Sequence, residues 1–213
     1  MTNLEDALVA VDAGADAVGF VFYEKSPRNI SIETARKIVE KLPGRADKVG
    51  VFVNETPERV SEIADEAGLT AVQLHGDEYK DADRYAIGGK LLFTLPVTDI
   101  VRDLRGQSGF CGLPKLPDGA CVLLDSGSRD RRGGTGKPFA WGEANQFVAT
   151  LKQFYRIVVA GGLTPSNVSW ASEFLNPWGV DVVSGVEASP GKKDPEKVRA
   201  FVRAVREHDR KVG

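Results

Sequence analysis

Short, continuous apolar segments recur along the chain, separated by longer segments of mixed polarity. Most of them do not alternate between apolar and polar residues, which is typical of strands buried on both faces of a parallel sheet. The pattern predicts seven strands, over residues 17–22, 48–53, 71–74, 90–94, 121–124, 156–160 and 180–183. Neighbouring strand centres lie about 20 to 35 residues apart, a spacing that suits repeated strand–helix units.

Apolar residues at helical spacing lie between these strands and predict eight helices. The first helix is expected to begin after a cap at Asn3 and to stop at Gly14. Three more helix starts combine a capping residue with a proline at the first helical position: Thr56-Pro57, Thr164-Pro165 and Asp194-Pro195. A further helix is indicated by the apolar stripe of Ala35, Ile38, Val39 and Leu42, and the remaining three are predicted near 78–86, 99–106 and 143–154.

The strict alternation of strands and helices favours a (β/α)8 TIM barrel, a single α/β domain spanning 1–213. A barrel needs eight strands to close, so one strand is missing from the pattern. Its place would come before Asn3, at the N-terminal end. A doubly wound open sheet is the structural alternative, but the glycine-rich G-x-G-x-x-G fingerprint of that fold does not occur.

Composition narrows the class of protein. The 213 residues include 28 Lys and Arg and 30 Asp and Glu, a balance that does not favour nucleic acid or an anionic membrane as partner. No apolar run reaches the roughly 18 residues of a membrane span, and there is no signal-peptide pattern, so we expect a cytoplasmic protein. Two cysteines (Cys111, Cys121) and two histidines (His75, His208) predict neither a disulfide framework nor a protein-ligated metal.

Two glycine-containing segments follow the last two predicted strands. Gly161 and Gly162 come after one strand, and Ser184 and Gly185 come after the next. Glycines let backbone N–H groups approach an anion closely, and in barrels the loops after the last two strands frequently hold a phosphate. These four residues are therefore candidate phosphate ligands, the alternative being that the glycines only form tight turns.

Three further residues lie directly after predicted strands and are candidates for chemistry. Asp125 ends an apolar run and is a candidate general acid, or else a capping or ion-paired carboxylate. Arg28 is a candidate for binding a substrate carboxylate through a bidentate contact, or else a solvated loop residue. His75 is a candidate substrate contact, or else a structural histidine bonded to the backbone.

Five sets of segments, in chain order over nearly the whole sequence, together resemble the phosphoribosylanthranilate isomerases of tryptophan biosynthesis. They are 3–8 (NLEDAL) with 14–20 (GADAVGF), 49–54 (VGVFVN), 72–76 (VQLHG), 123–125 (LLD) with 133–137 (GGTGK), and 160–163 (AGGL) with 180–187 (VDVVSGVE). The combination is specific, although residues from about 91 to 119 match poorly.

The resemblance implies an Amadori rearrangement without a cofactor. N-(5-phosphoribosyl)anthranilate would become 1-(2-carboxyphenylamino)-1-deoxyribulose 5-phosphate, the third step from chorismate to tryptophan. By motif, Asp125 matches the acid that protonates the furanose ring oxygen, and Arg28 matches the contact to the anthranilate carboxylate. The Gly161-Gly162 and Ser184-Gly185 motifs match the phosphate site.

One family motif has no counterpart. The family's first strand reads Lys-Ile-Cys-Gly, its cysteine removes the C2 proton, and the match here begins only after it. Cys111 lies in the poorly matching region and is a weak candidate to replace this base, whereas Cys121 is expected in the core at the opposite end of a strand. The missing motif has three possible explanations, of which we favour a shortened or mis-started coding sequence. The other two are that another segment or another copy of the chain fills the gap, or that the protein is a non-catalytic relative.

Two functions therefore compete with the isomerase. The first is a phosphate-binding barrel without isomerase activity, which the missing base favours. The second is another sugar-phosphate enzyme with the same fold, because fold alone does not determine function. The partner expected in each case is a small sugar phosphate rather than nucleic acid or membrane, with the chain a monomer or a homodimer.

Overall fold

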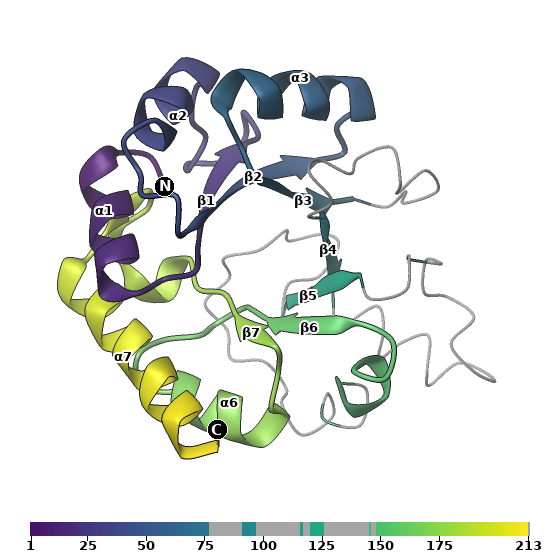
Figure 1. The fold of residues 1–213 in the computed structure, drawn as a ribbon, viewed down its shortest axis with the longest axis vertical. Coiled ribbons are helices and arrows are strands. Elements are labelled where there is room, and N and C mark those ends of the chain that lie inside the picture. Colours follow the sequence, from purple (N-terminus) through teal and green to yellow (C-terminus); the bar gives the residue numbers. More distant parts are fainter. Residues whose placement is uncertain (77–90, 97–115, 117–119, 126–144, 146–147, 213) are drawn as a thin grey trace.

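A computed structural model describes residues 1–76, 91–96, 116, 120–125, 145 and 148–212 of the chain. Seven parallel strands form one curled sheet in which every strand pairs with its neighbours in chain order (Figure 1). They are β1 (Ala17–Phe22), β2 (Asp47–Val53), β3 (Ala71–His75), β4 (Leu91–Pro96), β5 (Cys121–Asp125), β6 (Arg156–Val159) and β7 (Gly179–Val180). This order is that of an α/β barrel and confirms the predicted fold class.

Helices cover the outer side of the sheet (Figure 1). They are α1 (Leu4–Ala13), α2 (Ile32–Val39), α3 (Pro57–Ala67), α6 (Val168–Leu175) and α7 (Pro195–Val212), and residues 145 and 148–151 are helical as well. A one-turn 3-10 helix, η2 (Ser184–Val186), leads into an antiparallel hairpin of β8 (Glu187–Ser189) and β9 (Lys192–Lys193). The helices predicted over 78–86 and 99–106 lie outside the described residues.

Three helix starts follow from the capping residues that predict them. Asn3 accepts a hydrogen bond from the backbone N–H of Asp6 at 2.8 Å, and Thr56 likewise caps α3. The Asp194 carboxylate accepts from the N–H of Glu196 at the start of α7. The start predicted at Thr164-Pro165 is wrong, because residues 164–167 form a turn and α6 begins only at Val168.

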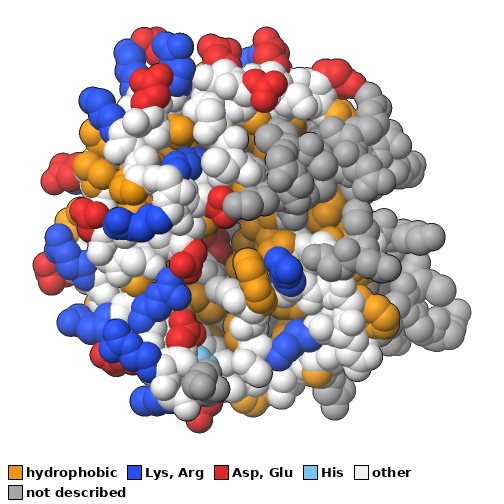
Figure 2. Space-filling view, viewed as in Figure 1, with side chains coloured by type: hydrophobic (Ala, Val, Ile, Leu, Met, Phe, Trp, Pro, Cys, Tyr) orange, Lys and Arg blue, Asp and Glu red, His pale blue; other side chains and the backbone are white. Residues whose placement is uncertain are grey.

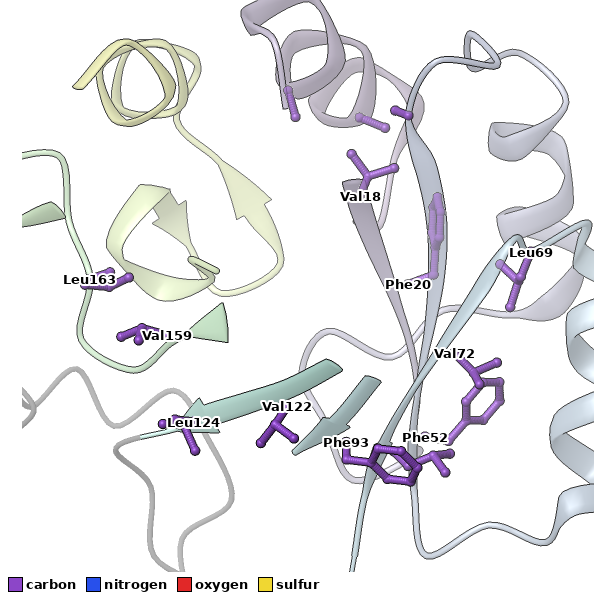
Figure 3. Packing of buried hydrophobic residues seen from close by; sticks show 14 of the residues in the cluster. Val18, Phe20, Phe52, Leu69, Val72, Phe93, Val122, Leu124, Val159 and Leu163 are labelled. Carbon is purple, nitrogen blue, oxygen red and sulfur yellow. The ribbon is translucent and has the colours of Figure 1, made fainter. Parts of the chain in front are cut away.

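Two hydrophobic layers hold the sheet. The larger lies between the strands and the helices and includes Phe20, Phe52 and Phe93, each at most 1% exposed (Figure 3). The smaller one lies on the opposite face of the strands and contains Leu123 and Val158. At about 25 cal/mol for each Å² of apolar surface removed from water, the larger layer is the main source of stability.

The sheet has two edges in the described part of the chain, β1 and β7. β7 ends at Val180, three residues earlier than predicted. Its neighbour β6 ends at Val159, which is the residue that pairs with Val180. Instead, residues near the N-terminus bond directly to the β8–β9 hairpin. The backbone N–H of Lys193 donates to the Asp6 carboxylate at 2.7 Å, and the Thr2 hydroxyl donates to the carbonyl of Gly191.

Candidate active site

Arg28 is held in a specific position by the loop after β1. Its backbone N–H donates to the Ser26 hydroxyl at 3.1 Å, which fixes the turn. Its guanidinium donates through Nε and Nη2 to the two carboxylate oxygens of Glu187, at 2.8 and 2.7 Å. The Arg28 side chain is only 20% exposed, so the alternative of a solvated loop arginine is wrong.

Glu187 is the most densely bonded carboxylate of this region. Besides Arg28 it accepts from the N–H of Gly191 at 3.3 Å, and it lies 3.5 Å from the ammonium of Lys193. Burial alone would raise the pKa of Glu187, but the hydrogen bonds from Arg28 and the charges of Lys193 and Arg28 hold that pKa below its usual value. Glu187 therefore stays ionised at neutral pH. Sequence reasoning did not single it out, although it ends the VDVVSGVE motif.

The two glycine-containing loops meet. Gly161 and Gly162 have φ values of +85° and +68°, a backbone conformation that favours glycine. Gly185 packs directly on the same loop, since a Cβ added there would overlap the carbonyl oxygen of Leu163 and lie 2.9 Å from its carbonyl carbon. Two segments more than twenty residues apart in sequence thus form one continuous turn-rich surface.

Asn167 explains both the shape of the first loop and the late start of α6. Its side-chain oxygen accepts from the N–H of Thr164 at 2.7 Å, and its amide donates to the carbonyl of Gly162 at 3.0 Å. The side chain therefore closes the turn that follows Gly162 and makes no capping hydrogen bond to the helix. Asn167 itself is the N-cap residue, directly before α6.

His75 lies at the carboxyl end of β3 within a polar cluster. Its Nε2 pairs with the Gln73 amide at 2.7 Å, and the same amide donates to the Thr94 hydroxyl at 3.1 Å. Its carbonyl accepts from the N–H of Asn54 at 2.9 Å. Side-chain and backbone bonds both position His75, so any contact with a ligand would come from an already constrained ring.

Asp125 ends β5 and is half-buried. Its charge acts on Asp181, which follows β7: burial raises the pKa of Asp181, the Asp125 carboxylate raises it further, and Lys193 opposes both. Sequence reasoning missed Asp181; the signal was a charged residue inside the apolar run 180–183. The carboxyl ends of β5 and β7 therefore bring two carboxyl groups close enough that the charge of Asp125 acts on Asp181.

Cys121 lies at the other end of β5 and packs in the smaller hydrophobic layer. Burial raises the pKa of its thiol to about 11. The expected core position of Cys121 agrees with this packing. Cys111 and the 133–137 segment lie outside the described residues.

Charged side chains of both signs are interspersed over the described part of the face in Figure 2, with hydrophobic side chains exposed near its centre. Among the described residues, no group of three or more His, Cys, Asp or Glu side chains is arranged to hold a metal ion. None of the described helices is long and apolar enough to cross a membrane.

Comparison with known proteins shows what this arrangement is similar to. The family model of N-(5'-phosphoribosyl)anthranilate (PRA) isomerase matches residues 1–204. The chain belongs to this family. A relative from Rubrobacter xylanophilus, named N-(5'-phosphoribosyl)anthranilate isomerase, is 46% identical over 207 residues, covering 97% of this chain and 96% of the relative.

Two solved PRA isomerase structures share the fold. One contains monomers generated from the dimeric enzyme of Thermotoga maritima; it has a TM-score of 0.77 and 38% identity, and the match covers 97% of this chain and 95% of that one. The other is a complex with reduced 1-(o-carboxyphenylamino)-1-deoxyribulose 5-phosphate (rCdRP), with a TM-score of 0.78, 38% identity and the same coverage.

Proposed function

We propose that this chain is an isomerase that converts N-(5-phosphoribosyl)anthranilate to 1-(2-carboxyphenylamino)-1-deoxyribulose 5-phosphate in tryptophan biosynthesis. The observation that carries this proposal is the family match over residues 1–204, at 46% identity to a relative of that name. The site geometry supports it, because a constrained arginine, two carboxyl groups that act on each other electrostatically and two touching glycine loops follow the strands.

The ligand-binding roles follow from charge and backbone geometry. We assign the phosphate to the surface formed by Gly161, Gly162, Ser184 and Gly185, where backbone N–H groups can approach an anion. We assign the aromatic carboxylate to the guanidinium of Arg28. His75 would contact the substrate from the carboxyl end of β3.

The chemistry requires one proton donor and one proton acceptor. Asp125 would protonate the ring oxygen, breaking the bond between that oxygen and C1 and leaving a Schiff base. Loss of the C2 proton to a base would give an enolamine, which tautomerises to the ketone. The proton supplied equals the proton removed, so substrate and product are isomers and no oxidant or reductant is needed.

Binding and turnover together test the proposal. Loss of phosphoribosylanthranilate fluorescence measures turnover, and the rise in melting temperature with rCdRP measures binding. We expect rCdRP to raise the melting temperature and Asp125→Ala to abolish turnover while retaining that shift. Binding of rCdRP without turnover in the parent chain would favour the phosphate-binding barrel. Stabilisation by other sugar phosphates but not by rCdRP would favour a different sugar-phosphate enzyme.

The same proposal places the enzyme in the cytoplasm with a small sugar phosphate as its partner. We expect a monomer or a homodimer, since the relative from Thermotoga maritima is described as dimeric.

A further inference from the structure

The Arg28 guanidinium has two usable edges, and Glu187 occupies one of them. Nε and Nη2 face the two oxygens of Glu187, so the pair is bidentate. Such a fork is planar and rigid, and fixing one edge fixes the direction of the Nη1–Nη2 edge. Glu187 therefore determines where Arg28 can offer a second bidentate contact.

Glu187 can do this because it is itself held from two other directions. The backbone N–H of Gly191 and the ammonium of Lys193 both bond or pair with its Oε1 atom. At 9% exposed, Glu187 has little room to change its rotamer. The contacts that hold Glu187 within the β8–β9 hairpin thereby also hold Arg28, which follows the edge strand β1.

The same hairpin reaches the glycine loop. The Lys193 ammonium donates to the carbonyl of Val183 at 2.9 Å, directly before Ser184 and Gly185. Glu187 directly follows η2, whose three residues include Ser184 and Gly185. The group that orients Arg28 and the groups that would hold phosphate thus belong to one short segment, with a fixed spacing between them.

We infer that Glu187 is a positioning residue for substrate, which aims the free edge of Arg28 at the aromatic carboxylate and sets its distance from the phosphate loop. This inference rests on the proposed function, since it assigns a role within the same site. The substrate class that this site would bind is an aromatic carboxylate joined to a sugar phosphate. Ligands that carry only the phosphate do not depend on Glu187.

Selectivity between two ligands separates positioning from a merely structural role. The variant is Glu187→Gln, which keeps the shape of the side chain and removes its charge. The probes are rCdRP, which has both ends, and ribose 5-phosphate, which lacks the carboxyphenyl group. We expect the Kd of rCdRP to rise about tenfold, which corresponds to about 1.4 kcal/mol, and the Kd of ribose 5-phosphate to change less than twofold.

Equal weakening of both ligands would overturn the inference, because it would show general loosening of the site, and so would no change in either. The matched control is Glu196→Gln, whose parent side chain is 88% exposed and pairs with Arg199 on α7. If Glu187→Gln does not fold, Glu187→Asp, which keeps the charge and shortens the reach by one methylene, gives the same comparison. Failure of the parent chain to bind rCdRP would instead refute the proposed function.

Discussion

At the scale of single residues, burial decides which groups of the site are reactive. Glu187 is buried beside two cations and stays ionised. Asp181 is half-buried and has a raised pKa, because desolvation and the Asp125 carboxylate outweigh the opposing charge of Lys193. Cys121 is half-buried against apolar side chains, and desolvation raises the pKa of its thiol, so the thiol is protonated and weakly nucleophilic at neutral pH. The positive charge of Arg156 lowers the pKa of the Cys121 thiol, but by less than desolvation raises it.

The Cys121 thiol should therefore be nearly inert toward thiol reagents. With a pKa of about 11, about one thiol in a thousand is ionised at pH 8. We expect the Cys111→Ser variant, in which Cys121 is the remaining cysteine, to react with Ellman's reagent at least a hundredfold more slowly than free cysteine. Denaturant should restore the ordinary rate. Rapid reaction of the folded variant at pH 8 would contradict the burial of this thiol.

At the scale of elements, the site depends on two loops that fit against each other. The turn after β6 is closed by Asn167, and the 3-10 turn η2 packs on it through Gly185. The fit leaves no space for even one methyl group. The two loops are therefore a single packed unit, although each follows a different strand.

Gly185→Ala tests this fit. The added methyl would overlap the Leu163 carbonyl, so one loop must move, and we expect a loss of about 1–3 kcal/mol of unfolding free energy. Binding of ribose 5-phosphate should weaken at least tenfold, as measured by titration. Gly44→Ala is the matched control, because a Cβ at Gly44 meets nothing within 4 Å. Equal behaviour of the two variants would show that the loops do not pack as described.

Local signals in the sequence were sufficient for most elements of the fold. Apolar runs marked the strands because both faces of a parallel strand are buried, and cap residues such as Asn3 and Thr56 marked helix starts because they bond to the first turn. The start of α6 and the extent of β7 were mispredicted, because both depend on contacts that local patterns do not show. The start of α6 depends on the Asn167 side chain, which accepts a hydrogen bond from the N–H of Thr164, three residues earlier. The extent of β7 depends on the extent of the neighbouring strand β6.

The candidate site was only partly accessible from sequence. Position after a strand singled out Arg28, His75, Asp125 and the glycines. It could not reveal Glu187, because its partner Arg28 is 159 residues away and the pair forms only when the two edges of the sheet approach. Asp181 was hidden for a similar reason, since its buried environment is assembled from distant elements.

At the scale of the whole molecule, side chains join the two edges of the sheet. The edge strands β1 and β7 are both labelled in Figure 1. Arg28 follows β1 and Glu187 follows β7, so their ion pair links the two edges of the sheet. The bond from Lys193 to Asp6 and the packing of α1 on α7 act between the same two edges. Closure of the described ring therefore depends partly on charge, whereas the other strand pairs have backbone ladders.

This dependence on charge makes the stability of the molecule sensitive to acid. The pKa of Glu187 is lower in the folded chain than its ordinary value of about 4.3, so its contribution is fully present above that value and is lost as pH falls through the folded pKa. We expect urea unfolding to show that the parent chain is more stable than Glu187→Gln by about 3 kcal/mol at pH 7. This difference in unfolding free energy should shrink as pH falls through the folded pKa of Glu187. A difference independent of pH would contradict this contribution.

The Arg28–Glu187 pair also constrains how the pocket can be redesigned for other ligands. Replacing Arg28 alone would remove the bidentate partner of the buried Glu187 carboxylate. Its charge would then be compensated only by Lys193 and the N–H of Gly191 among the described contacts. Replacing both with neutral side chains of similar volume removes that carboxylate but also takes one charge partner away from the buried Lys193 ammonium. Arg28, Glu187 and Lys193 thus form one unit of mutation, and libraries that vary the three jointly will contain folded variants that single-site libraries miss.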